Sequence, residues 1–202
     1  MSRKEREQQQ RRQEIVDAAE RLFLQKGFAH VTMEQIAKES EFTRKTLYSY
    51  FKNREDLFTV VFLKISKIRW VILKEAIEKK KSGYDKLWAF GDAYYHFAVQ
   101  YPEYFRMGVY LDHNGMDFEK ISSEVSEEFC IYRNMALDDL RSAYKVGQQD
   151  GSLREDININ INITHLCLSL RTMLNEIVLG YEKKEFYYEY LELFLSSLKS
   201  KK

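Results

Sequence analysis

"TMEQIAKESEFTRKTLYSYFKNREDLF", residues 32–58, is the stretch that decides the fold of this chain of 202 residues. It opens on Thr32 and Gln35, which have the spacing of a capping box. Val31 and Ile36 lie where a hydrophobic staple would pack across the start of a helix. These signals predict a short helix from about Met33 to Ser40.

A second short helix is predicted about three residues further on. Thr43 is a suitable N-cap, and Leu47 and Phe51 lie four positions apart, so both share the face that turns toward a core. Asn53 is expected to cap a longer helix that runs from Arg54 to about Glu78. Two short helices joined by so few residues are typical of a helix-turn-helix motif.

Another helix is predicted upstream, where apolar residues recur at helical spacing and a glycine follows as a C-terminal stop: Ile15, Ala18, Ala19, Leu22 and Phe23, then Gly27. With Leu47 and Phe51 inward, the helix after Thr43 leaves cations and hydroxyl groups outside. Arginine and lysine can donate to guanine edges in the major groove, and tyrosine and threonine hydroxyls can contact phosphates. From this helix alone, a solvated surface with Tyr50 half-buried is an equally good interpretation.

Composition indicates a globular protein, with 45% hydrophobic and 31% charged residues and a net charge of +1. Residues 1–54 carry twelve Lys/Arg against eight Asp/Glu, whereas the rest carries twenty against twenty-three. A modestly basic front fits a nucleic-acid-binding head, although the excess is small. The polar N-terminus is unlike a secretory signal, and no apolar run approaches the roughly 20 residues that span a bilayer. We therefore expect a cytoplasmic protein without a membrane partner, whose Cys130 and Cys167 are buried free thiols.

Residues 32–58 closely resemble the DNA-binding signature of TetR-type transcriptional regulators. The pattern is a threonine, an Ile-Ala pair, a turn, Ser/Thr, then Leu-Tyr-x-Tyr-Phe, a basic stretch and an acidic-Leu ending. The preceding "IVDAAERLFLQKGFAHVT" (15–32) is similar to the family's first helix and turn, and "AYKVGQQDGSLRED" (143–156) to its Gly-x-x-x-Gly-x-Leu-Arg segment. The resemblance implies an all-α homodimer that binds a DNA operator, usually as a repressor released by a small-molecule effector.

The resemblance also implies roles for individual residues. Base contacts fall to Arg44, Lys45 and Tyr48, with Thr46 close to them, and phosphate contacts to Thr32, Thr43, Tyr50 and Arg54; Lys52 flanks the same surface and joins the candidate set. Two positions depart from the pattern. Glu41 stands where the family usually has a turn glycine, so it is expected to adopt a left-handed conformation. Arg54 replaces a commoner lysine, which changes its geometry toward phosphate.

Residues 84–101, "YDKLWAFGDAYYHFAVQY", are apolar or aromatic almost all round a helix, as in a helix buried on every side. Pro102 is expected to begin the next helix. The resemblance implies that this region lines an effector cavity, which makes seven residues candidates for a hydrophobic or aromatic ligand: Trp88, Tyr94, Tyr95, Phe97, Tyr101, Phe105 and Tyr110. A plain aromatic core explains the same spacing.

The alternating "INININIT", residues 157–164, has the period of a strand, but asparagine disfavours strands and helical spacing resumes at once. We expect a capped entry around Asp156–Asn160, a helix to about Leu179 and a stop at Gly180. A last amphipathic helix follows. The resemblance assigns this pair of helices to the dimer interface, through Leu166, Leu170, Leu174, Ile177, Tyr187, Leu191 and Phe194; packing within one chain is the alternative.

The four histidines lack metal-ligand spacing, and no phosphate loop or nucleophile elbow is present, so we expect no metal, cofactor or catalytic residue. The overall prediction is an all-α chain: a helix-turn-helix head over residues 1–52 and a connecting helix with a ligand-binding, dimerising bundle over residues 53–202. The alternatives are a helical small-molecule-binding protein whose head no longer binds a specific operator, and a helical-bundle enzyme without a recognisable catalytic constellation.

Overall fold

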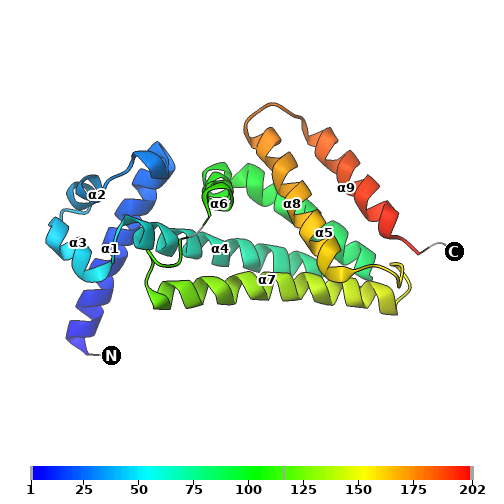
Figure 1. Ribbon diagram of the computed structural model, residues 1–202, viewed down its shortest axis with the longest axis horizontal. Helices are drawn as coiled ribbons and strands as arrows, with labels where there is room; N and C mark the ends of the chain where they lie inside the picture. Colours follow the sequence, from blue (N-terminus) through cyan, green and yellow to red (C-terminus); the bar gives the residue numbers. More distant parts are fainter. Residues whose placement is uncertain (1, 116, 201–202) are drawn as a thin grey trace. The chain divides into compact units, whose positions relative to one another are not determined.

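The computed structural model describes residues 2–115 and 117–200, and in this part of the chain the regular secondary structure is helical, as predicted (Figure 1). The helices are α1 (Arg3–Lys26), η1 (Phe28–His30), α2 (Met33–Glu39), α3 (Arg44–Tyr50), α4 (Arg54–Glu78), α5 (Gly83–Gln100), α6 (Pro102–Asn114), α7 (Ser123–Gln149), α8 (Ile159–Val178) and α9 (Lys184–Leu198). Within these ranges no helix combines the length and apolar character that a bilayer crossing requires.

The first helix is longer than its apolar pattern indicates, because it begins at Arg3 in the polar N-terminal stretch. Ser2 and Glu5 form a capping box there: the Ser2 hydroxyl accepts from the Glu5 amide, and the Glu5 carboxylate accepts from the Ser2 amide. Side chains four positions apart then support the exposed turns, as in the Arg3–Glu7 ion pair. Sequence periodicity cannot detect such a helix, since no apolar face marks it.

The chain divides into two compact units. Unit 1 comprises residues 1–66 and 110–130, and unit 2 comprises residues 67–109 and 131–202. The predicted boundary at 52/53 differs from this division, which falls inside α4. The reason is the burial of the first turns of α4 in the head: Leu57 and Phe58 are at most 1% exposed, and the Phe58 ring lies 5.2 Å from that of Phe23 in an edge-on contact.

The core of unit 1 contains the apolar residues that the sequence places inward. Ile15, Ile36 and Leu47 are fully buried, and Phe51 is 2% exposed. Val31 is fully buried beside the α2 capping box, as a hydrophobic staple requires. These contacts join α1, α2 and α3 and fix the orientation of the two short helices.

In unit 2, α5 packs against α8 and α9. The Tyr187 hydroxyl on α9 donates to the Gly91 carbonyl on α5 at 2.7 Å, and the Tyr188 hydroxyl donates to the Asp92 carboxylate at 2.7 Å. Gly91 permits this closeness, because a Cβ at that position would lie 2.7 Å from the Leu191 side chain. The three helices therefore form a core within a single chain.

This packing corrects most of the predicted dimer interface. Five of the seven residues lie in the monomer core at 0% exposure and offer no surface to a second copy: Leu166, Leu170, Leu174, Tyr187 and Leu191. Ile177 and Phe194 keep partial exposure. The amphipathic stripes that indicated a dimer are used by α5 of the same chain, which was the alternative that spacing left open.

The alternating stretch before α8 resolves as a capped helix start, as predicted. The Asn158 side chain accepts a hydrogen bond from the Ile161 amide at 3.1 Å, which is an N-cap, and α8 continues to Val178 with Gly180 just beyond at φ 81°. The cysteines differ from expectation. Cys130 is exposed, whereas burial raises the pKa of the Cys167 thiol to about 11.

Candidate nucleic-acid interface

Helix α3 is held at both ends by its own sequence. The Thr43 hydroxyl accepts from the Thr46 amide at 3.1 Å, and the two threonine hydroxyls lie 2.9 Å apart. Leu47 and Phe51 anchor one face of the helix in the core of unit 1. Because those two side chains point inward, the remaining side chains of α3 face solvent.

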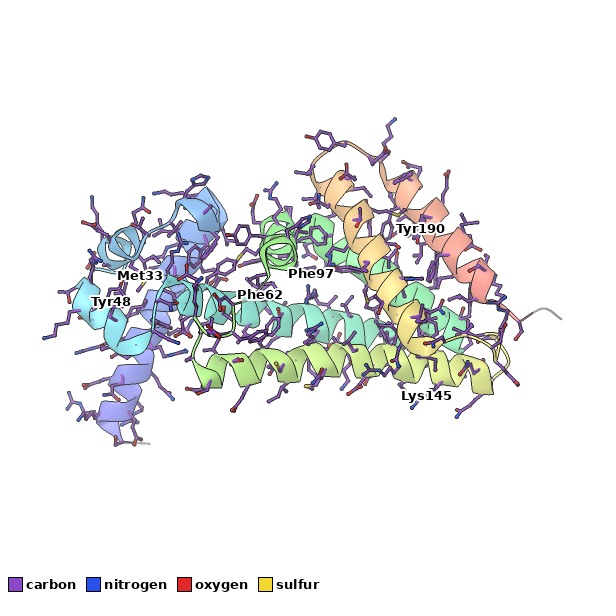
Figure 2. All side chains as sticks on the ribbon, viewed as in Figure 1. Met33, Tyr48, Phe62, Phe97, Lys145 and Tyr190 are labelled. Atoms are coloured by element: carbon purple, nitrogen blue, oxygen red, sulfur yellow. The ribbon has the colours of Figure 1, made fainter. Side chains whose placement is uncertain are left out.

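The solvent side of α3 carries the predicted base-contacting residues. Arg44, Lys45 and Tyr48 are exposed, Tyr48 at 47%, and Figure 2 labels Tyr48 on this helix. Thr46 is partly exposed beside them. The structure therefore brings two cations and a phenol hydroxyl together on one short helix, a donor set that can bind guanine edges and phosphate oxygens.

The turn before α3 confirms the expectation for Glu41. Its φ is 58°, and it is the non-glycine residue with positive φ in the described part of the chain. The Phe42 amide then donates to the Ala37 carbonyl at 3.0 Å, which closes the turn between α2 and α3. The left-handed conformation lets the chain turn from α2 to α3 within the four residues 40–43.

Thr32 and Tyr50 lie at the ends of the same two helices. The Thr32 hydroxyl accepts from the Gln35 amide at 3.3 Å, and the Gln35 side chain accepts from the Thr32 amide at 2.9 Å. Thr32 is exposed, and Tyr50 is partly exposed with its ring 6.5 Å from Phe51. Both side chains reach the surface, so their assignment as phosphate contacts stays a prediction.

Arg54 makes contacts within unit 1 that the sequence did not indicate. Its guanidinium donates to the Val31 carbonyl at 3.1 Å, pairs with Glu55 at 3.3 Å and lies 4.3 Å from the Phe28 ring centroid. These three contacts use the cation inside unit 1, with 29% of the side chain exposed. These contacts stabilise the head, and the phosphate contact of Arg54 stays a prediction.

Two features near α3 were not found from the sequence. Arg12 on α1 lies over the Phe51 ring, with its guanidinium carbon 5.1 Å from the ring centroid. Lys52, a predicted DNA contact, donates from its ammonium group to the Glu119 carbonyl at 2.6 Å. Both contacts join segments far apart in sequence, so no local pattern announces them.

The seven candidate ligand-lining residues are divided between the two units. Tyr110 belongs to unit 1, where its ring lies 5.1 Å from Phe28 and 6.0 Å from Phe58. The other six lie in unit 2, mostly as core: Tyr94 against Phe105 at 5.9 Å, Tyr95 against Tyr187 at 5.4 Å, Phe97 against Tyr101 at 5.5 Å and Trp88 against Tyr188 at 6.0 Å. Two open surface hollows lie on α8 and α9, and none of the seven residues lines them.

Residues 15–61 match the family of bacterial regulatory proteins named tetR. The HTH-type transcriptional regulator AcrR of Shigella flexneri is 41% identical over 63 residues, which cover 31% of this chain and 29% of that protein. The HTH-type transcriptional regulator YhgD of Bacillus subtilis is 35% identical over 68 residues, 34% of this chain and 36% of that protein. These alignments span well under half of either relative.

Likeness of fold extends over the whole chain. A TetR family transcription regulator from Marinobacter aquaeolei VT8 has a TM-score of 0.70 at 17% identity, covering 99% of this chain and 100% of that one. FadR from Bacillus subtilis in complex with stearoyl-CoA has a TM-score of 0.70 at 18% identity, covering 92% and 98%. Residues 15–61 thus match the tetR helix-turn-helix domain in sequence, and the chain as a whole shares the fold of TetR family transcription regulators.

Proposed function

We propose that the chain is a homodimeric repressor that binds a near-palindromic operator and is released from it by a small hydrophobic or aromatic effector. The observation that supports this most directly is the solvent face of α3, where Arg44, Lys45 and Tyr48 stand on a helix anchored by Leu47. A short, rigid helix with donors on its outer face suits insertion into the major groove.

The proposal of a dimer rests on the outer surface of α8 and α9. Large apolar side chains are exposed on these helices and their connection, at 42–74% of their area: Ile161, Leu168, Leu179, Tyr181, Phe186 and Leu193. A symmetric pair formed through this surface would present two copies of α3 to two half-sites, and a symmetric dimer reads a symmetric duplex. Leu193, at 72% exposure, takes the place of the buried Leu191 in this proposal.

The proposal of an effector rests on the ring-rich core of unit 2 and on the fold shared with a FadR that binds stearoyl-CoA. Because Tyr94, Tyr95, Phe97 and Phe105 are buried, an effector must separate packed rings to enter. Such a molecule releases DNA only if it binds better to the conformer with wrongly spaced heads. Trp88 lies 6.0 Å from Tyr188 in this region and provides a fluorescence reporter.

Selection of duplexes from randomised DNA with the purified chain tests the operator. We expect an inverted repeat and an affinity that falls steeply with salt, as phosphate counterions are released. Arg44→Ala and Lys45→Ala should each lose on the order of 1–3 kcal/mol of discrimination at one base pair. Lys145→Ala, an exposed lysine on α7 (Figure 2), is the matched control and should leave base preference unchanged. A selection without any shared sequence contradicts the proposal.

A panel of apolar and aromatic compounds, with stearoyl-CoA among them, tests the effector. A true effector should quench Trp88 fluorescence and lower operator affinity over the same concentration range. Tyr94→Ala should change both responses together, since Tyr94 contacts Phe90 and Phe105 among the packed rings that an effector would have to separate. If compounds quench the fluorescence without any effect on DNA binding, the quenching site is not regulatory.

A further inference from the structure

A buried carboxylate lies where α3 ends and α4 begins. Asp56 is 3% exposed and accepts three hydrogen bonds. One comes from the Lys52 amide at 3.0 Å, and two come from the Ser122 amide and hydroxyl, each at 2.8 Å. A carboxylate removed from water needs such donors, because burial penalises its charge. Asp56 thus joins Lys52, two residues beyond the end of α3, to Ser122, which lies 66 positions after Asp56.

Two further contacts fasten the same pair of segments. The Lys52 ammonium group donates to the Glu119 carbonyl at 2.6 Å, and the Asn53 side-chain amide donates to the Lys120 carbonyl at 2.6 Å. Ile121 lies between these points and is 5% exposed. We call residues 117–122, between α6 and α7, the latch segment. It is docked on residues 52–56 by three hydrogen bonds between side chains of that stretch and its own backbone, and by one from the Ser122 hydroxyl.

The position of these contacts matters because α3 has only two turns to hold it. Its core anchors are Leu47 and Phe51, and Phe51 is the C-cap residue directly before Lys52. The direction of α3 relative to α4 is therefore set by the short connection 51–53, which Asp56 fixes through the Lys52 amide.

We propose that Asp56 is a positioning residue for DNA recognition, which orients α3 only while the latch segment is docked at the start of α4. This inference rests on the DNA-binding function proposed above. Asp56 itself is buried and touches no base. It acts through Lys52 and Ser122, and asparagine cannot replace it, since one of its two terminal atoms would then be a donor facing a donor.

Chain continuity makes the latch a route for regulation. The latch segment lies within residues 110–130 of unit 1, and both of its flanking helices continue into unit 2: α6 through Val109 and α7 from Ile131. A ligand that displaces the unit 2 parts of α6 and α7 would also displace the latch segment at both of its ends. Loss of the Asp56–Ser122 bonds would then free the 51–53 connection and with it α3.

Amide hydrogen exchange in the absence of DNA tests the latch itself. Asp56→Asn should speed exchange of the Lys52 and Ser122 amides at least tenfold. Ser122→Ala, which keeps the backbone donor, should have a smaller effect. Glu124→Gln is the matched control: it removes one negative charge from an exposed position of the same unit and should change neither amide. Unchanged exchange in Asp56→Asn overturns the latch.

DNA binding tests the positioning role. The probes are the duplex selected by the wild-type chain and a scrambled duplex of equal composition, at one salt concentration. Asp56→Asn should weaken binding to the selected duplex about tenfold and leave the scrambled duplex within twofold, because non-specific binding depends on the net charge attracted to the phosphates and much less on the orientation of α3. A partly unfolded variant would instead lose both affinities by the same factor, and that result, or no loss at all, overturns the inference. Should the wild-type chain select no duplex, the proposed function fails, whereas the exchange experiment still decides the latch.

Discussion

Helices α3 and α5 both carry tyrosines that the sequence suggests as functional residues, but those of α3 reach the surface and those of α5 are buried. In α3 two apolar residues are buried and the tyrosines reach the surface, with Tyr48 at 47% exposure. In α5 the rings of Tyr94, Tyr95 and Phe97 are at most 9% exposed. A DNA-reading surface needs side chains outside a helix, which a motif specifies locally. A ligand cavity needs space between helices, and a motif cannot specify space.

Two buried polar groups, Asp56 in unit 1 and Tyr144 in unit 2, differ in their hydrogen bonding. The Asp56 carboxylate in unit 1 accepts hydrogen bonds from three donors. Tyr144 in unit 2 is fully buried, and its hydroxyl is without a hydrogen-bond partner among the described residues; burial also raises the pKa of this phenol. The buried carboxylate beside α3 is therefore satisfied, whereas the Tyr144 hydroxyl in the core of unit 2 is not; the buried Ser66 hydroxyl of unit 1 also lacks a partner among the described residues.

The largest expected effect is the difference in the free energy of unfolding between substitutions on the buried face and on the exposed face of α9. Leu191→Ala should reduce the free energy of unfolding by about 3 kcal/mol, because it leaves a cavity against α5. Leu193→Ala, on the exposed face, should change it by less than about 0.5 kcal/mol. Chemical denaturation measures both. Leu193→Glu should in addition weaken self-association in sedimentation with the helicity intact; a variant that stays fully associated would place the dimer interface elsewhere.

The next largest effect on stability is expected at Gly83, where the backbones of α5 and α7 lie in close contact. A Cβ on Gly83 would lie 2.1 Å from the backbone nitrogen of Gly147 on α7, so Gly83→Ala must push two helices apart. We expect a loss of about 2–3 kcal/mol in the free energy of unfolding. Gly91→Ala meets only the Leu191 side chain at 2.7 Å, which can shift, and should cost about 1 kcal/mol. If both variants lost the same stability in thermal unfolding, the backbone contact between α5 and α7 would be no less adaptable than the contact between Gly91 and the Leu191 side chain.

A pair of fully buried tyrosines tests the contrast in hydrogen bonding. Tyr144→Phe should stabilise the protein by about 1 kcal/mol, because it removes a hydroxyl that has no partner. Tyr187→Phe should destabilise it by about 1 kcal/mol, since the Tyr187 hydroxyl donates to the Gly91 carbonyl at 2.7 Å. Both free energies come from the same denaturation experiment. A loss in Tyr144→Phe would show that its hydroxyl is satisfied in solution.

The smallest effect lies in the head. Glu41→Gly relieves a left-handed residue at φ 58° and should stabilise the chain by up to about 1 kcal/mol, less the added entropy of the unfolded glycine. Lys38→Gly, inside α2, should instead cost about 1 kcal/mol. Thermal unfolding midpoints that shift in the same direction for both variants would mean that Glu41 is not strained.

The head was predictable because local rules act within a few residues. Thr32 and Thr43 cap α2 and α3, and α4 begins at Arg54 and ends at Glu78 as expected. Glu41 adopts the left-handed conformation that the departure from a turn glycine indicates. The N-terminal extension of α1 to Arg3 was not predictable from periodicity, since its polar turns are supported by capping and ion pairs instead of an apolar face.

The sequence by itself therefore determined the all-α class, the capped helix-turn-helix and the cationic outer face of α3, because each depends on side chains within one or two turns of one another. Only the tertiary structure decided which stripes of α8 and α9 are core, where Tyr110 packs and what Arg54 contacts. It also decided that Asp56 meets Ser122. Amphipathic spacing says that a face is buried and not by which partner, and the partner of each of these residues lies far away in the chain.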